Sequence, residues 1–330
     1  MISTTKAPAP RLDDLYARTK LMCFGRYAVE VPSEAEQIMG LQDIDAGFAL
    51  FKRSQFADST ELLRARWSKL KAENRRPEML TDILDGPVQG ARHFWFIKSP
   101  VARRFDAKWL DGAIPIGGHF YLYRGFAAKM ERLSPDEIYQ RMTALMRGMR
   151  AWDGKSVPRE PGVCIEGAFI DEPTYRFQEI MSSGFAFPSM PDVHFSVMSN
   201  KDASTEGDNG KGLLERVDEA RSEQLCYPYS FLRRGKRTLH GLWDGEEVLA
   251  RRSDGTLEFD WEMVGETGNV ARPPWFEMGL RTRVADNEVG AARTSAISDE
   301  QAVALWDRLL EGVKFRVAVP GATAASVALG

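Results

Sequence analysis

Apolar residues recur at helical spacing in four stretches of the chain. In residues 58–76 they repeat every three to four positions as Leu63, Trp67 and Leu70, and Pro77 follows the stretch. Such a stripe opposite charged residues predicts an amphipathic helix that packs on a sheet. A shorter helix is predicted over residues 211–225.

The other two predicted helices begin with a capping box. Ser134 is followed by Pro135 and Glu137, and Ser298 is followed by Gln301. In this motif the serine caps the first turn of the helix and the acid or amide three residues later caps the serine backbone in return. We therefore expect one long capped helix near the end of each half of the chain.

Strand signals lie between these helices. Residues 257–263 alternate strictly, with four apolar side chains on one face and Glu258, Asp260 and Glu262 on the other. This alternation is typical of an antiparallel sheet with one face toward water. Asp-Gly pairs at residues 244–245 and 254–255 predict hairpin turns. The fold class predicted is α+β, with antiparallel sheets packed against helices.

The two halves of the chain open in a similar way. Cys23 and Cys164 each lie in an apolar strand segment, and Pro32 and Pro173 follow at the same distance. A polar segment, residues 154–162, separates the halves and predicts a linker. We expect two similar domains, residues 15–153 and 163–320, with disordered ends at residues 1–14 and 321–330.

Composition excludes some classes of function. The 330 residues include 44 basic and 47 acidic ones, a net charge of −3 that is unlike the basic balance of nucleic-acid-binding proteins. No stretch reaches the length of a membrane span, and the first residues lack the pattern of a signal peptide. Three cysteines, Cys23, Cys164 and Cys226, are too few for a disulfide framework. Buried free thiols are the expected state.

Catalytic and metal-binding motifs are missing from the sequence. It has no nucleophile elbow, phosphate-binding loop, dinucleotide fingerprint or metalloprotease helix. We therefore predict a protein that is not an enzyme and has no cofactor or metal. The alternative is a hydrolase whose triad is assembled from distant residues, including one of the four histidines, His93, His119, His194 and His240.

Three charged segments allow a functional interpretation but favour an ordinary one. The three carboxylates of residues 257–263 resemble a solvated strand face more than an acid-base or metal cluster. The segment that begins at Asp202 starts like a calcium loop, but Leu213 stands where the bidentate glutamate belongs. The basic pairs and runs at residues 103–104 and 233–237 are expected to be solvated faces, with contact to an acidic partner as the alternative.

A distributed pattern runs through the segments 23–32, 164–170, 276–281, 304–307 and 315–316. This pattern resembles the type VI secretion lipase-immunity family of Tli type. The resemblance covers about residues 15–320. It implies a periplasmic protein of two α+β domains around a cleft, which binds and inhibits a cognate lipase or phospholipase effector. A scaffold or chaperone-type binding protein is the remaining alternative.

Two places are predicted to contact the partner. Residues 200–212 form a polar loop, and its acidic residues Asp202, Glu206 and Asp208 would speed encounter with a basic surface. Trp243, beside the predicted turn at residues 244–245, is the candidate aromatic anchor.

Overall fold

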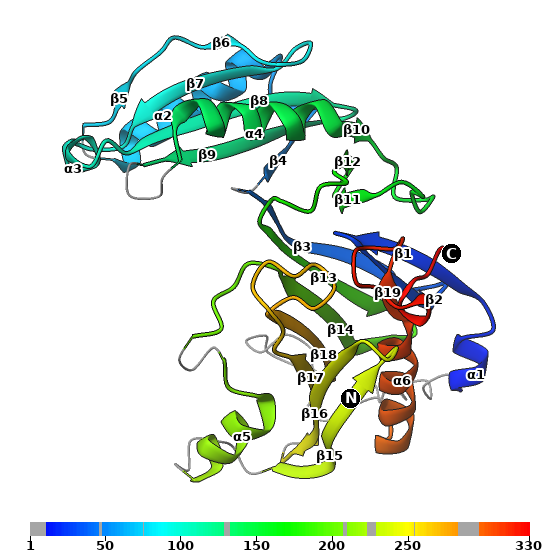
Figure 1. Ribbon diagram of the computed structural model, residues 1–330. Coiled ribbons are helices and arrows are strands. Elements are labelled where there is room, and N and C mark those ends of the chain that lie inside the picture. The colour runs from blue at the N-terminus through cyan, green and yellow to red at the C-terminus, as the bar shows by residue number, and fades with distance from the viewer. Residues whose placement is uncertain are drawn as a thin grey trace, which may run out of the picture. The chain divides into compact units, whose positions relative to one another are not determined.

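The computed structural model describes residues 11–45, 48–74, 76–128, 133–206, 210–222, 229–253, 255–282 and 297–330. The chain divides into two compact units (Figure 1). Unit 1 consists of Met1–Leu41 together with Glu179–Gly330, and unit 2 consists of Gln42–Gln178. The fold class is α+β with antiparallel sheets, as the sequence predicts.

Unit 1 is built on a seven-stranded sheet of order β15-β16-β17-β18-β14-β13-β3. From β15 to β13 neighbouring strands pair antiparallel. The strands are β3 (Glu36–Ile44), β13 (Glu179–Phe187), β14 (Met190–Asn200), β15 (Tyr229–Leu239), β16 (Trp243–Arg252), β17 (Leu257–Met263) and β18 (Trp275–Thr282).

One face of this sheet is buried by helix α6 (Asp299–Gly312) and by a small sheet of order β1-β2-β19. Trp306 of α6 meets Phe195 and Phe259 edge-on, at ring-centroid distances of 6.2 and 6.0 Å. Tyr27 of the small sheet stacks on Phe276 at 5.1 Å. These large side chains form the core of unit 1. The remaining elements are β1 (Thr19–Phe24), β2 (Tyr27–Pro32), β19 (Val313–Phe315), α1 (Leu12–Leu15), α5 (Leu213–Ser222) and η4 (Ala324–Ser326).

Unit 2 is a sheet of order β4-β9-β8-β7-β5 between two helices, α2 (Ser59–Glu73) and α4 (Pro135–Gly148) (Figure 1). Leucines of α2 pack with Phe94 and Phe96 on one face. Met142 of α4 lies over Gly112 on the other face, so close that a side chain there would collide with it. The bounds are β4 (Phe48–Lys52), η1 (Arg53–Gln55), β5 (Glu78–Met79), β6 (Leu84–Asp85), β7 (Arg92–Ile97), α3 (Pro100–Arg104), β8 (Lys108–Ile116) and β9 (His119–Ala127).

A second small sheet in unit 2 repeats the arrangement of the one in unit 1. Its order is β10-β12-β11, formed by β10 (Met149–Ala151), β11 (Gly162–Ile165) and β12 (Ala168–Asp171). In both units a hairpin pairs through its second strand with the short strand that directly follows a 14-residue helix capped by serine. The two openings and the two capped helices were expected to be similar. In each unit they form the same arrangement, a hairpin joined to the strand that follows the helix.

The two cysteines of the repeat occupy matching positions. Cys23 lies opposite Ala28 in β1-β2, and Cys164 lies opposite Phe169 in β11-β12. Both are buried, with 1% of each side chain exposed. Both are also disulfide-bonded, so the expectation of free thiols is wrong for this pair. Residue types and spacing alone cannot show which strands the fold brings within bonding distance.

The compact units differ from the continuous halves expected from the sequence. The first hairpin and β3 belong to unit 1 because β2 pairs with β19 and β3 extends the sheet of β13. The expected disordered tail at residues 321–330 is wrong, since Ala328 N–H donates to Phe315 O at 2.8 Å and a 3-10 turn is capped by Thr323. In the expected disordered segment 1–14, α1 begins at Leu12, while residues 1–10 lie outside the described residues.

One hairpin turn lies four residues before its predicted place. Asp244 and Gly245 are within β16, and the turn from β15 uses His240 and Gly241, both with positive φ (53° and 61°). Two consecutive positive φ values define the tight turn that joins antiparallel strands. Gly245 instead makes room for the indole of Trp261. At the second predicted turn Gly255 has a φ of 84°, and Asp254 lies outside the described residues.

We predict that replacing the last glycine of either capped helix with alanine destabilises the protein. Such a change inside a helix ordinarily stabilises it by about 1 kcal/mol. Here an added Cβ would lie 2.5 Å from the carbonyl oxygen of Asp171 for Gly148, and 2.7 Å from that of Glu30 for Gly312. Overlap with backbone should instead cost roughly 1–3 kcal/mol.

Urea denaturation of Gly148→Ala and Gly312→Ala measures this cost. Gly118→Ala is the control, because nothing lies within 4 Å of the position that its added Cβ would take, and its φ is not positive. A gain of stability in either helix variant would contradict the close approach of helix end and strand.

Candidate functional site

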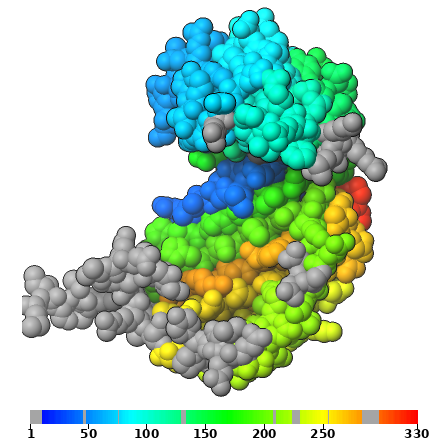
Figure 2. All heavy atoms as spheres, turned by 90° about the vertical axis from the view of Figure 1, so that its left-hand side faces the viewer, coloured from blue at the N-terminus to red at the C-terminus, as the bar shows by residue number. Residues whose placement is uncertain are grey.

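The candidate site is the face of the seven-stranded sheet opposite α6, which we call the open face. Along β13 and β17 buried and half-buried residues alternate without a break, so one set of side chains packs inward and the other faces out. Figure 2 shows this face, with β13 and β14 in green, β18 in orange and β17 in yellow. Its side chains include Ile180, Ser182, His194, Ser196, Met198, Glu258, Asp260, Glu262, Glu277 and Arg281.

Charged residues gather on β17 and β18. The guanidinium of Arg281 donates to the Asp260 carboxylate at 2.6 Å and lies 3.5 Å from that of Glu258. Glu258 also pairs with Arg252 at 3.0 Å, and Glu262 pairs with Arg216 of α5. Each of the three carboxylates therefore has an arginine partner.

Burial raises the pKa of the Asp260 carboxyl, and the nearby Arg281 opposes this effect. The three carboxylates lie on the half-buried strand face, as the alternation predicts, but they are ion-paired rather than simply solvated. No cluster of three metal-binding side chains occurs among the described residues. The arrangement is that of a charged, ion-paired surface, without the convergent carboxylates of an acid-base site.

Large apolar side chains border this charged area. On the edge strand β3, Ile38 is 60% exposed. At the far ends of β17 and β18, Val264 and Trp275 are each 36% exposed. The indole N–H of Trp275 donates to Glu277 at 2.8 Å, which fixes the ring at the surface. Exposed apolar side chains next to polar ones are a common feature of protein-binding sites.

The predicted acidic loop is only partly described. Asp202 is half-buried, and its carboxylate pairs with the buried Lys201 at 3.1 Å. Glu206 is exposed. Asp208 lies outside the described residues. Of the two described acids, Glu206 is thus the more accessible to a partner.

Trp243 cannot serve as the surface anchor predicted for it. Its side chain is 0% exposed, and its indole N–H donates to the carbonyl of Ala271 at 2.8 Å. The ring packs against Phe276 and Phe315 at centroid distances of 4.8 and 5.2 Å. A tryptophan beside a hairpin turn faces either side of its sheet, and this one faces the core. Trp275 is the exposed tryptophan that sequence reasoning missed. It is the first residue of its strand, where the alternation of buried and exposed positions is hard to recognise in the sequence.

The basic run at residues 233–237 is engaged within unit 1. Arg233 and Arg237 both bind the carboxylate of Asp307 on α6, and both also approach Glu247. Their neighbour Arg234 points to the other face and pairs with Asp218 at 3.0 Å. The expectation of a solvated face is therefore wrong for this run. At the other basic pair, Arg103 binds Glu78 and Arg104 is exposed.

The described histidines have no nucleophile beside them. His240 is bonded to the carbonyl of Val313 at 2.8 Å, and burial lowers its pKa. His93 is buried against Tyr139, with a ring-centroid distance of 5.0 Å, and burial lowers its pKa as well. Within the described ranges, no histidine hydrogen-bonds a serine, threonine or cysteine side chain.

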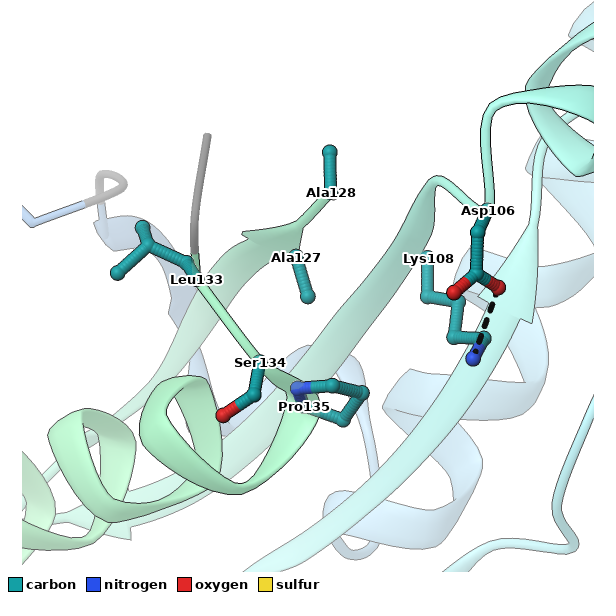
Figure 3. A pocket seen from close by; sticks show the side chains of 7 residues that line it. All are labelled: Asp106, Lys108, Ala127, Ala128, Leu133, Ser134 and Pro135. Carbon is teal, nitrogen blue, oxygen red and sulfur yellow. Dashed lines mark ion pairs between the residues drawn. The ribbon is translucent and has the colours of Figure 1, made fainter. Parts of the chain in front are cut away.

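A small hollow of about 300 Å³ lies in unit 2 at the start of α4 (Figure 3). Its two charged residues, Asp106 and Lys108, pair with each other at 3.0 Å. Ser134 contributes its hydroxyl to the cap of α4. The polar groups of this hollow are thus engaged with one another. In the part of the chain that the structure describes, no helix is long and apolar enough to cross a membrane.

We predict that Arg281→Gln lowers the stability of the protein at neutral pH by about 1 kcal/mol. An arginine that favours the ionised form of Asp260 stabilises the fold only while that carboxyl is ionised. The deficit should therefore be present at neutral pH and shrink as the pH falls through the raised pKa of Asp260.

Urea denaturation at several pH values tests this. The control is Arg150→Gln, because Arg150 and its partner Glu160 are both well exposed, at 47% and 59%. A deficit for Arg281→Gln that stays constant down to acid pH would show that the pairing with Asp260 is not its cause.

Known structures resemble the chain over most of its length. The apo structure of immunity protein TplEi of T6SS from Pseudomonas aeruginosa is 24% identical, with a TM-score of 0.67, and 90% of this chain and 97% of that chain are covered. The same protein complexed with "L" peptide is 23% identical with a TM-score of 0.64, covering 90% and 98%. The crystal structure of the Tle4-Tli4 complex contains a chain that is 27% identical with a TM-score of 0.69, covering 90% and 97%.

Residues 156–318 match the family of the Tle cognate immunity protein 4 C-terminal domain. This match begins inside the segment predicted as the linker, residues 154–162, and ends close to the predicted boundary at residue 320. No curated protein matches the sequence. The family match and the similarity of fold lead to one conclusion: residues 156–318 are a C-terminal domain of the type VI secretion lipase-immunity family, and the chain as a whole is similar in fold to solved immunity proteins.

Proposed function

We propose that this protein is an immunity protein that binds a cognate lipase effector and keeps it inactive. The observation that carries the proposal is the likeness of 90% of the chain to a chain in the Tle4-Tli4 complex, together with the family match over residues 156–318. An inhibitor of this kind needs a large, specific contact surface and no active site of its own. We therefore propose stoichiometric inhibition without catalysis.

The open face of unit 1 is the contact surface that we propose. It combines the features of a stable interface, since it is broad, carries oriented charges on β17 and β18, and is bordered by Ile38 and Trp275. Aromatic and aliphatic side chains that become buried in an interface supply most of its binding free energy, whereas the charges select the partner and align it. Surfaces of both units are proposed to contribute to the contact.

The acidic loop is proposed to act on the rate of association. Glu206 is exposed and Asp202 is half-buried, and charges at the border of an interface mainly steer the encounter of two proteins. Removing them should slow binding and weaken its dependence on salt, with a smaller effect on dissociation.

We also propose a periplasmic location. The disulfide-bonded state of Cys23 and Cys164 supports it, because disulfides persist in oxidising compartments and are rare where glutathione keeps thiols reduced. The cysteines are buried in the small sheets, where oxidation would have to accompany folding.

The central test is inhibition of the cognate lipase, which is to be sought as the product of a gene adjacent to that of this protein. We predict that Trp275→Ala and Ile38→Asp each weaken inhibition at least tenfold, which corresponds to a loss of about 1.4 kcal/mol of binding free energy. Both side chains are exposed, so the folded protein should keep its melting temperature within a few degrees. Inhibition constants and melting temperatures are measured together.

Ala17→Asp is the matched control, because Ala17 is exposed in unit 1 next to α1 and away from the open face. If the wild-type chain fails to bind the lipase, the immunity function is wrong. If the wild type binds and neither open-face variant weakens the complex, the function stands and the proposed surface is wrong. Lipid hydrolysis by the purified protein alone, abolished by changing one serine or histidine, would contradict the non-catalytic role.

We predict that the cysteines are oxidised when the protein is produced in the periplasm. Thiol titration of the denatured protein should then find fewer free thiols than the three that the sequence supplies. Reduction should lower the melting temperature, since a disulfide typically contributes about 2–4 kcal/mol. A Cys226→Ser variant should keep the full effect, and equal stability of oxidised and reduced wild type would contradict a structural role.

A further inference from the structure

A cavity of about 300 Å³ lies in unit 2 beside α2. The helix packs over β7 and β8, while the sheet continues through β9 to β4. The cavity occupies the place where the sheet extends past the helix. Its apolar lining comes from β4, β9, α2 and the turn before α2, with the side chains of Ala49, Phe51, Phe56, Leu62, Ala65 and Leu122.

Cations complete the lining. Arg66 and Lys69 come from α2. Arg124 comes from β9, two residues after Leu122, so that both side chains lie on the same face of the strand. An apolar interior with basic groups at its border is the arrangement that receives an amphiphilic anion, with the tail inside and the charged head at the border.

Two of these cations already have carboxylate partners. Arg66 donates to the buried carboxylate of Asp111 at 2.9 Å, which holds its guanidinium in place. Lys69 lies 3.6 Å from Glu73 on the surface of α2. Arg124 is exposed and has no hydrogen-bonded or ion-paired partner among the described residues. One positive charge of the lining is therefore not offset.

The charges that shift the pKa of a neighbouring lysine agree with this surplus of positive charge. Burial lowers the pKa of Lys98, Asp111 raises it, and the nearby Arg66 and Arg124 lower it further. The region around Asp111 thus holds more positive than negative charge. Among the residues that line the cavity itself, the surplus is the one charge of Arg124, and a single negative charge at the border would balance it.

We propose that this cavity binds a single-chain aliphatic carboxylate. The hydrocarbon chain lies among the apolar side chains, and the carboxylate accepts hydrogen bonds from Arg124 and from the remaining donors of Arg66. The planar fork of an arginine matches a carboxylate. A phosphate monoester carries nearly two negative charges at neutral pH, which exceeds the one that is not offset. This site is separate from the open face and does not depend on the proposed function.

Calorimetric titration of the full chain with dodecanoate, below the concentration at which it forms micelles, tests the proposal. We expect saturable binding of one dodecanoate per chain. Dodecyltrimethylammonium, with the same chain and the opposite charge, should bind at least tenfold more weakly. Ala65→Trp should abolish binding by filling the cavity, whereas Ala72→Trp, also exposed on α2, should not change it. Arg124→Gln should weaken binding at least tenfold, and Arg64→Gln should have no effect.

Each contrary result would overturn a stated part of the proposal. Equal binding of the cationic and anionic amphiphiles would show a nonspecific apolar surface, and binding unchanged by Ala65→Trp would place the ligand elsewhere. Dodecyl phosphate binding tenfold more tightly than dodecanoate would replace the carboxylate with a phosphate headgroup. Melting curves of every variant show that it is folded, so loss of binding by unfolding is recognised directly.

Discussion

The buried ion pair between Arg26 and Glu179 is the constraint on which the arrangement of unit 1 depends. Arg26 lies in the turn of the first hairpin and Glu179 is the first residue of β13, and their charged groups are 2.6 Å apart with 3% and 8% of the side chains exposed. A buried pair of this kind need not stabilise the fold relative to apolar residues, but leaving one partner alone costs about 3–5 kcal/mol. The chain forms the first hairpin, continues through unit 2 and must then return to unit 1. The pair is made only when Glu179, at the start of β13, reaches Arg26 of that hairpin. Tyr27 and Ser199, bonded at 3.0 Å, reinforce the same junction.

This long-range requirement explains which parts of the fold could be predicted from the sequence. The capped helices were predictable because a capping box is local, and Ser134 and Ser298 begin their helices as expected. The alternation of residues 257–263 likewise identified a strand with one buried face. In contrast, β1 and β2 join the small sheet of β19, and β3 joins the seven-stranded sheet. These assignments depend on partners far away in sequence. Local patterns carry no information about which of two similar sheets a hairpin will join.

The candidate site shows the same limit on a smaller scale. Glu258, Asp260 and Glu262 were placed on the outward face because the two-residue period of a strand fixes it. Their arginine partners come from β18, α5 and β16, so pairing could not be predicted. Trp243 and Trp275 both flank strand ends, and composition does not distinguish the buried one from the exposed one. The disulfide-bonded state of Cys23 and Cys164 was missed for a related reason. The number of cysteines in a sequence does not show which of them lie close together in the fold.

The pairing of β2 with β19 has a consequence for the order of folding. Val29 lies opposite Val313 in the register of the two strands, so strands near opposite ends of the chain must meet before the small sheet of unit 1 exists. The sheet and both helices of unit 2 come from one continuous segment and need no residue beyond Gln178. During synthesis unit 2 can become compact first, while the N-terminal hairpin has its partner strand only after nearly the whole chain has been made. Unit 1 is in this respect a late-assembling domain, and its apolar hairpin is exposed to chaperones or to aggregation until the last helix arrives.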